Sequence, residues 1–253
     1  MKRIVLTDGG MGQELLRRSG AAPTPLWSAR VLIDEPDLVR DLHADFIDAG
    51  ARVITINTYA ATPERLEREG VGELFEELQQ RGIDLAKQAR DMTGADVRIA
   101  GCLPPLFGSY KPELTLSFDE TLEIYRRVVA AQKDQVDLIL CETMASAEEA
   151  LAAATAASEA SLPVWVSWTL QDSLDGAQLR SGETIEEAAK AIAHIKFEAR
   201  MINCSKPEVI SAGMDDLIAL GGPVGAYANG FTSIGALKHG GTVDVLEARR
   251  DLG

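Results

Sequence analysis

The sequence predicts an α/β fold of the (β/α)8 TIM-barrel type, in a single domain of residues 1–253 whose eighth βα unit is missing. Three observations support this prediction. First, α/β barrels commonly fill a length near 253 residues as one domain. Second, short β-rich runs alternate with longer segments of helical periodicity, the pattern of a parallel sheet built from βα units. Third, most of these runs are continuously apolar, as expected for strands covered on both faces.

We expect seven strands and find no eighth. The expected strands are residues 4–7, 53–57, 97–102, 138–141, 164–169, 200–203 and 224–228. Helix starts are marked by capping-box spacing at Ser117 with Glu120, Ser146 with Glu149 and Thr184 with Glu187, and by Pro36 in a first turn. After the seventh strand the chain continues as a loop and then an expected helix over 243–252, so we expect the eighth unit to lie beyond Gly253 or to be absent.

The composition excludes several classes of protein. The 25 Lys and Arg against 39 Asp and Glu give a formal net charge of −14, which repels nucleic-acid phosphates and anionic lipid headgroups. No apolar stretch approaches the roughly 20 residues that cross a bilayer, and Asp8 comes too early for a secretory signal. We expect a cytoplasmic protein with no nucleic-acid or membrane partner, and its oligomeric state stays open. The three widely spaced cysteines favour reduced thiols.

The first expected strand ends in an acid and three glycines, within Thr7-Asp8-Gly9-Gly10-Met11-Gly12. Glycines at the end of a strand let backbone amides approach a ligand closely, because no Cβ intervenes. The alternative is a tight βα turn whose glycines require positive φ. A phosphate cradle is disfavoured, because the run lacks both the G-x-G-x-x-G spacing and the Lys-Ser/Thr of a P-loop.

Glu142 follows the four apolar residues of the fourth expected strand. A carboxylate there is costly to bury, so it either faces the cavity at the carboxyl ends of the strands or forms a salt bridge to a neighbouring loop. Because side chains alternate along a strand, we expect Cys141 to point toward the helices and to pack as a small hydrophobe.

Three polar side chains follow the sixth and seventh expected strands. Cys204 can bind zinc or act as a nucleophile, or it can simply pack in the core. Lys206 shares its strand parity and is either a Schiff-base amine or a solvated loop lysine. Asn229 can orient a polar ligand or cap a turn. The histidines lie away from the strand ends, so neither a Ser-His-Asp triad nor a His-rich metal motif is expected.

Seven short motifs follow one another along the chain. They are Asp8-Gly9-Gly10-Met11-Gly12 with Glu14-Leu15-Leu16; Trp27-Ser28-Ala29; Ala49-Gly50-Ala51 leading to Ile54-Thr55-Ile56-Asn57-Thr58-Tyr59; Ala100-Gly101-Cys102-Leu103-Pro104-Pro105; Cys141-Glu142-Thr143; Asn203-Cys204; and Tyr227-Ala228-Asn229. In this order, from about residue 4 to residue 230, they resemble the homocysteine S-methyltransferase family, which includes betaine-homocysteine methyltransferases and the homocysteine-binding module of cobalamin-dependent methionine synthase.

The resemblance implies a (β/α)8 barrel with zinc at the carboxyl ends of its strands. It implies transfer of a methyl group from a small donor to the thiolate of homocysteine, which forms methionine. The implied contacts are Asp8, Gly9 and Gly10 at the amino-acid portion of homocysteine, Glu142 on its ammonium, Cys204 on zinc, and Asn229 as an exchangeable oxygen ligand. Zinc favours the thiolate form of the bound sulfur, and beyond this metal activation no catalytic group is implied.

The chain departs from the family pattern near its end. The pattern has two adjacent cysteines after two glycines, whereas Gly240-Gly241 is followed by Thr242-Val243. Of three expected thiolates Cys204 alone remains, so we expect zinc to be weakly bound or absent unless two further cysteines lie beyond Gly253. Two other hypotheses are a metal-free barrel that binds an amino acid or thiol without catalysis, and a Schiff-base lyase using Lys206. The donor stays open among S-methylmethionine, S-adenosylmethionine, betaine and a folate or cobalamin partner.

Overall fold

A computed structural model describes residues 4–22, 24–174 and 176–230 of the protein. The chain forms two compact units. The first comprises the described residues of Met1–Leu103 together with Arg127–Leu140, and the second comprises Pro104–Arg126 with those of Cys141–Gly253. The single domain of residues 1–253 stays a prediction.

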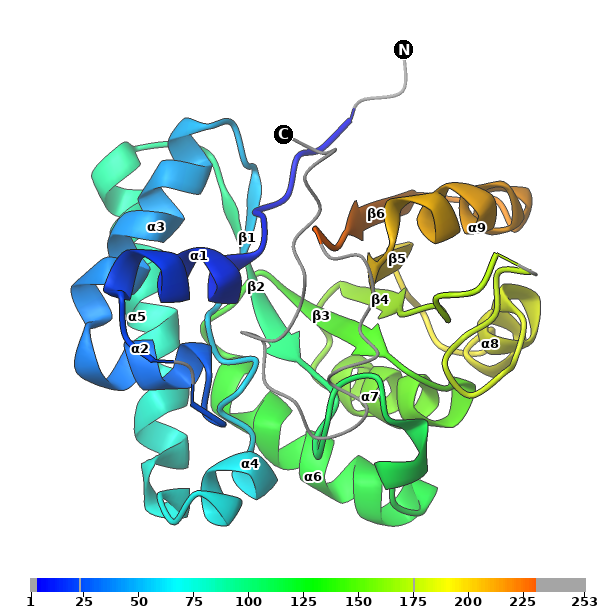
Figure 1. Ribbon diagram of the computed structural model, residues 1–253, viewed down its shortest axis with the longest axis horizontal. Coiled ribbons are helices and arrows are strands. Elements are labelled where there is room, and N and C mark those ends of the chain that lie inside the picture. The colour runs from blue at the N-terminus through cyan, green and yellow to red at the C-terminus, as the bar shows by residue number, and fades with distance from the viewer. Residues whose placement is uncertain (1–3, 23, 175, 231–253) are drawn as a thin grey trace. The chain divides into compact units, whose positions relative to one another are not determined.

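The first unit contains most of the N-terminal elements (Figure 1). Its elements are α1 (Met11–Ser19), α2 (Ser28–Asp34), α3 (Pro36–Asp48), β1 (Val53–Thr55), α4 (Pro63–Arg68), the 3-10 helix η1 (Gly72–Leu74), α5 (Phe75–Thr93), β2 (Arg98–Leu103) and the first residues of β3 (Leu138–Met144). β1 and β2 pair in parallel, with Val53 opposite Arg98. The end of α6 (Phe118–Gln132) also belongs to this unit.

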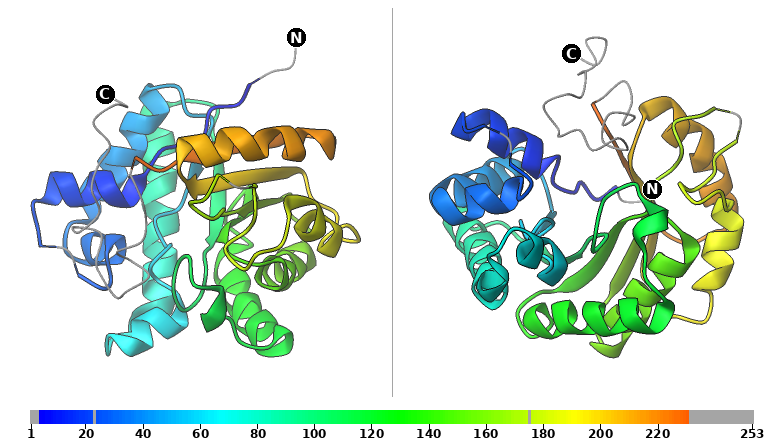
Figure 2. Two further views of the ribbon diagram at one scale, coloured as in Figure 1. Left: turned by 45° about the vertical axis from the view of Figure 1, so that its right-hand side comes forward. Right: turned by 60° about the horizontal axis from the view of Figure 1, so that its bottom comes forward.

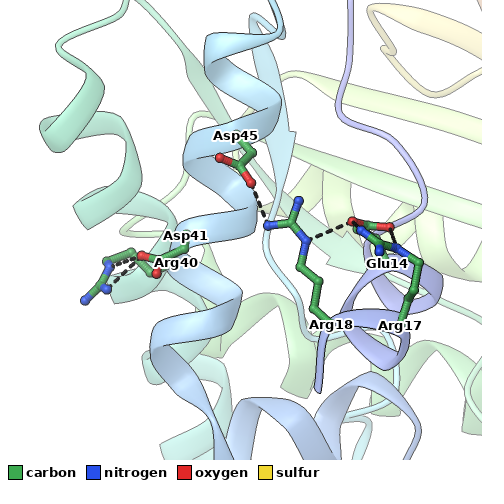
Figure 3. Close-up of polar contacts among 6 residues, drawn as sticks. All are labelled: Glu14, Arg17, Arg18, Arg40, Asp41 and Asp45. Carbon is green, nitrogen blue, oxygen red and sulfur yellow. Dashed lines mark hydrogen bonds and ion pairs between the residues drawn. The ribbon is translucent and has the colours of Figure 1, made fainter. Parts of the chain in front are cut away.

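Helix packing and ion pairs connect the helices of the first unit. α3 lies along α5, as Figures 1 and 2 both show, and buries Val39, Leu42 and Ile47. Arg18 of α1 joins Glu14 to Asp45 of α3, at 2.8 and 2.5 Å (Figure 3).

The buried side-chain amide of Gln132, in α6, hydrogen-bonds the backbone of β2. The Gln132 side chain accepts from Cys102 N at 2.9 Å and donates to Cys102 O at 3.1 Å. Its Nε2 also donates to Gln79 Oε1 at 2.8 Å. The two bonds to Cys102 satisfy backbone groups of β2, which would be costly to bury without hydrogen-bond partners.

The second unit continues the alternation of strands and helices. Its elements are the 3-10 helix η2 (Pro112–Leu114), most of α6, the end of β3, α7 (Ala147–Glu159), β4 (Val164–Trp168), α8 (Ile185–Ala191), β5 (Ala199–Ser205), α9 (Pro207–Ala219) and β6 (Val224–Ala228). β4 pairs with β5 and β5 with β6, in parallel and in chain order. α9 lies along β5 and β6 (Figure 2), and α7 presents a face of buried alanines.

These observations confirm the predicted fold class. The six strands are neighbours in the order of the sequence, the order of a TIM-type barrel, and they alternate with helices. Six of the seven expected strands are present with bounds shifted by a few residues. The expected helix over 243–252 lies outside the described residues. In the described part of the chain, no helix is both long and apolar enough to cross a bilayer.

The prediction of a strand over residues 4–7 is wrong. This segment forms a single parallel bridge, from Thr7 to Val53, supported by backbone bonds from Arg52 N to Leu6 O and from Asp8 N to Val53 O. Ile4, Val5 and Leu6 are 92%, 48% and 53% exposed. Because their side chains bury little apolar surface, little offsets the entropy of ordering an extended strand.

The predicted helix starts are largely confirmed. Thr184 and Glu187 form a reciprocal capping box, and Pro36 occupies the first turn of α3. Ser146 caps α7 by accepting from Glu149 N, but the Glu149 carboxylate accepts from Ala145 N, one residue before the expected partner. Each capping signal depends on residues within about one helical turn of each other, which explains why the sequence alone reveals it.

Candidate active site

The hydroxyl of Tyr227 joins a carboxylate and a thiol in the second unit. It donates to Glu142 Oε2 at 2.9 Å, and it lies 3.4 Å from the Cys204 sulfur. Glu142 belongs to the end of β3, Cys204 to the end of β5, and Tyr227 to β6. Glu142 is only 8% exposed. Two of the residues flagged from the sequence, Glu142 and Cys204, therefore lie in one cluster at the carboxyl ends of parallel strands.

Asn203 fixes the geometry of this cluster. Its Nδ2 donates to Tyr227 Oη at 2.6 Å and to Thr143 Oγ1 at 2.8 Å. Its Oδ1 accepts from Thr143 N at 3.0 Å and from Ser167 Oγ at 2.6 Å. Since Asn203 is fully buried and bonded through both ends of its amide, it holds the ends of β3, β5 and β6 in one arrangement.

A β-bulge turns Cys204 into the cluster. The pairing of β5 with β6 shifts between Asn203 and Ser205, and Cys204 has a φ of 49°. Thr143, which follows Glu142, also has positive φ, at 62°. Such conformations cost non-glycine residues energy and gather at functional sites. Because the bulge breaks strand alternation, the even spacing of Cys204 and Lys206 no longer implies that they face the same side. The argument from spacing that placed Lys206 beside Cys204 is therefore lost.

The cluster favours neutral forms of its thiol and phenol. Burial raises the pKa of Cys204, and the negative charge of Glu142 raises it further, against hydrogen bonds from Tyr227, Thr143 and Tyr110. Burial likewise raises the pKa of Tyr227 well above its ordinary value, with Cys204 and Glu142 adding to the effect. Burial and the charge of Glu142 therefore both favour the protonated form of the Cys204 thiol.

The other strand-end residues have separate environments. Asn229 extends the β5–β6 pairing through a bond from its backbone N to Ser205 O at 2.9 Å, and its Nδ2 is buried without a partner among the described residues. Lys206 lies just before α9, next to Pro207. Cys141 is fully buried, as expected for a packed hydrophobe, and burial raises the pKa of its thiol. Cys102, Cys141 and Cys204 are all free thiols.

In the first unit, Asp8 and its glycines form a compact turn before α1. Asp8 Oδ2 accepts from Thr55 N at 2.7 Å, so the carboxylate covers the end of β1. Gly9, Gly10 and Gly12 do not have positive φ, so the alternative of a turn that requires positive φ is wrong for all three. Close approach explains two of them, because a Cβ on Gly9 would lie 2.9 Å from Phe46 and a Cβ on Gly12 would lie 2.4 Å from Trp27. Nothing described lies within 4 Å of a Cβ on Gly10.

The described residues do not by themselves fit a zinc ion. Among them no three His, Cys, Asp or Glu side chains gather as a metal group needs. Structural and catalytic zinc sites use three or four protein ligands, and Cys204 is the only thiol of the cluster in the described part of the chain. A metal at this cluster would need ligands beyond those described.

Sequence reasoning gave no role to the residues that organise the cluster, although Asn203 and Tyr227 stand in two of the quoted motifs. Tyr227 and Asn203 lie inside strands, where an aromatic ring or a buried amide is ordinarily part of the packing. Tyr110 lies on a loop without a recognisable motif. The usable signal was position, because Tyr227 precedes Asn229 by two residues and Asn203 precedes Cys204, so each shares a strand end with a flagged residue.

Parallel βα units with a thiol and a carboxylate at the strand ends place the chain among α/β enzymes of the TIM-barrel class. A family model described as Homocysteine S-methyltransferase matches residues 5–248. The selenocysteine methyltransferase of Astragalus bisulcatus is 32% identical over 93% of this chain and 79% of its own length. The homocysteine S-methyltransferase of Escherichia coli (strain K12) is 30% identical over 86% of this chain and 74% of its own length.

A solved structure agrees with these matches. The crystal structure of the homocysteine methyltransferase MmuM from Escherichia coli, in its metallated form, has a TM-score of 0.79 to this chain at 29% identity, covering 90% of this chain and 84% of that one. The chain belongs to the homocysteine S-methyltransferase family. It is an enzyme of the methyltransferase class.

Proposed function

We propose that this protein transfers a methyl group from a small methyl donor to the thiolate of homocysteine and so forms methionine. The homocysteine sulfur attacks the methyl carbon, an S–CH3 bond forms, and the bond from that carbon to the donor breaks, with its electron pair leaving on the donor. Family membership supports the reaction class. The observation that supports this site is the meeting of Glu142 and Cys204 at the Tyr227 hydroxyl.

In this proposal Glu142 binds the ammonium of homocysteine and positions it, and transfers no proton. Its carboxylate is buried and already accepts from Tyr227, which fixes its direction. Holding the sulfur and the methyl carbon in line lowers the barrier by removing the entropy of their encounter. Asp8, Gly9 and Gly10 contact the amino-acid portion of homocysteine, where the open space beside Gly10 leaves its backbone accessible.

We further propose that Cys204 is one ligand of a zinc ion and Asn229 an exchangeable oxygen ligand. When bound, zinc supplies a positive charge that favours the thiolate of the substrate. Further thiolates would have to come from outside the described residues, because Cys204 is the one described thiol that contacts this cluster. The bond from Asn229 N to Ser205 O, at 2.9 Å, places Asn229 beside the end of β5 that carries Cys204, which supports this assignment.

Methionine formation tests the proposal directly. The purified chain is incubated with L-homocysteine and, in turn, S-methylmethionine, S-adenosylmethionine and betaine, with and without added zinc, and methionine is measured by mass spectrometry. We expect methionine from at least one donor and none after Glu142→Ala. Homocysteine binding with no product from any donor would instead support the metal-free binding barrel.

Metal content tests the ligand assignment separately. In a form of the protein that carries the two further cysteines, we expect Cys204→Ser to lower the zinc bound per chain, measured by plasma emission after dialysis, while the circular dichroism spectrum stays unchanged. Cys102→Ser is the matched control, because Cys102 is buried in β2 of the first unit. Equal zinc in wild type and Cys204→Ser would remove Cys204 as a ligand.

Selenocysteine is a second acceptor to test. The Astragalus bisulcatus relative is named for methylating it, at 32% identity over 93% of this chain. A selenolate can attack the same methyl carbon from the same amino-acid scaffold. Competition between the two acceptors at equal concentration would show which of them the protein prefers.

A further inference from the structure

Arg180 is a buried cation beside the cluster that the proposed chemistry does not use. It lies in the segment between β4 and α8, next to the antiparallel bridge of Leu170 with Leu179. Its side chain is fully covered. Nη1 donates to Asp172 Oδ1 at 3.1 Å, Nε lies 3.4 Å from Thr169 Oγ1, and Cζ lies 5.2 Å from the centre of the Tyr110 ring.

Two of these neighbours link Arg180 to Cys204. Thr169 Oγ1 donates to the backbone oxygen of Cys204 at 3.1 Å, and the Tyr110 hydroxyl hydrogen-bonds the Cys204 side chain. The guanidinium and the thiol also interact electrostatically. Tyr110 has a φ of 67°, the third positive φ at this cluster after Thr143 and Cys204. Arg180 therefore belongs to the same site as the thiol.

One nitrogen of the guanidinium is left unused. Nη2 is buried and has no hydrogen-bond partner among the described residues. A guanidinium stays charged and carries five N–H donors, and an unpaired donor on a buried charge is especially costly. Asp172 pairs with Nη1, so Nη2 is the guanidinium nitrogen whose donors are not satisfied by the described residues.

The planar guanidinium of arginine matches the geometry of carboxylates and of phosphates. Homocysteine, S-methylmethionine, S-adenosylmethionine and betaine all carry a carboxylate. We propose that Arg180 Nη2 binds a substrate carboxylate, that of homocysteine or that of the methyl donor, and so selects substrates with a carboxylate. This inference rests on the proposed function, because it takes its two candidate ligands from that reaction.

Pairs of ligands that differ only in the carboxylate test the inference. For the acceptor, L-homocysteine is compared with 3-aminopropane-1-thiol by isothermal titration calorimetry. For the donor, S-methylmethionine is compared with (3-aminopropyl)dimethylsulfonium by KM and kcat. Each pair is measured on wild type, Arg180→Met, Arg180→Lys and Arg200→Met. Arg200 is the control, since it lies at the start of β5, roughly 13 Å along the strand from Cys204, and donates to Leu220 O.

We expect Arg180→Met to weaken the carboxylated member of one pair by about 30-fold or more, the loss for truncating one partner of a buried charge pair, and to leave the other member nearly unchanged. Arg180→Lys should recover part of the loss, because it keeps the charge without the fork. The pair that responds identifies whether the carboxylate belongs to homocysteine or to the donor. Arg200→Met should bind all ligands as wild type does.

Equal effects of Arg180→Met on both members of each pair, or no effect on any, would overturn the inference, even if methionine is formed. A wild type that prefers carboxylated ligands through Arg180 but forms no methionine would overturn the proposed function and keep the inference. A wild type that binds neither member of either pair would overturn both. Circular dichroism of Arg180→Met against wild type checks that a loss of binding is not a loss of folding.

Discussion

Removing the Tyr227 hydroxyl tests whether one group holds the carboxylate and the thiol together. Tyr227→Phe deletes the donor to Glu142 Oε2, at 2.9 Å, and the acceptor of Asn203 Nδ2, at 2.6 Å. A hydrogen bond to a charged group contributes about 1.5–3 kcal/mol, and Glu142 is too buried for water to replace the donor freely. We expect the free energy of unfolding to fall by about 2–3 kcal/mol, which lowers the melting temperature by roughly 4–12 °C.

Urea unfolding followed by tryptophan fluorescence measures this loss, because Trp165 and Trp168 lie in the second unit. Tyr125→Phe is the matched control. It deletes a bond of 3.0 Å to the neutral carbonyl of Pro104 and should cost about 1 kcal/mol.

A double-mutant cycle with Glu142→Gln then separates the pair from its surroundings. We expect a coupling energy of about 1 kcal/mol or more between Tyr227 and Glu142, and a value within about 0.5 kcal/mol of zero between Tyr125 and Glu142. A coupling energy near zero between Tyr227 and Glu142 would refute the claim that the Tyr227 hydroxyl holds the Glu142 carboxylate in this site.

Three further predictions concern the first unit. Burial lowers the pKa of His43 to about 4, below the value near 6.5 of the unfolded chain. Because the unfolded chain then binds the proton first as the pH falls, the free energy of unfolding should drop by about 2 kcal/mol from pH 7 to pH 5. In urea titrations, His43→Leu should remove most of this pH dependence. Gly101→Ala should cost about 1–3 kcal/mol in thermal melts, because its Cβ would lie 2.4 Å from Gln132 Oε1; an unchanged melt would contradict the packing. Arg18→Met, which breaks the ion pair with Asp45 (Figure 3), should cost about 1 kcal/mol at low salt and less at 1 M salt.

The fold could be predicted because its signals are local. Apolar runs and capping pairs mark β1 to β6 and the helix starts, and each depends on residues close together in the sequence. The failed strand over residues 4–7 has the same apolar pattern as the others. What differs is burial, since Ile4 is 92% exposed, and burial depends on distant parts of the chain.

The site could be predicted only in part, for a related reason. Glu142 and Cys204 stand out because a carboxylate and a thiol follow apolar strands. Strand alternation does not hold at Cys204, because the pairing of β5 with β6 shifts there and the residue has positive φ. Arg180 reaches the cluster from a loop, and its unused Nη2 is visible only once the burial of that side chain is known.

The central claim is that Glu142 binds the ammonium of an amino-acid thiol beside Cys204. Calorimetric titration of L-homocysteine into wild type and Glu142→Ala tests it most directly, with 4-mercaptobutanoate, which lacks the ammonium, as the comparison ligand. We predict that Glu142→Ala weakens homocysteine binding by about 2–5 kcal/mol and leaves the binding of 4-mercaptobutanoate unchanged. Equal affinity of the two proteins for homocysteine would contradict the claim.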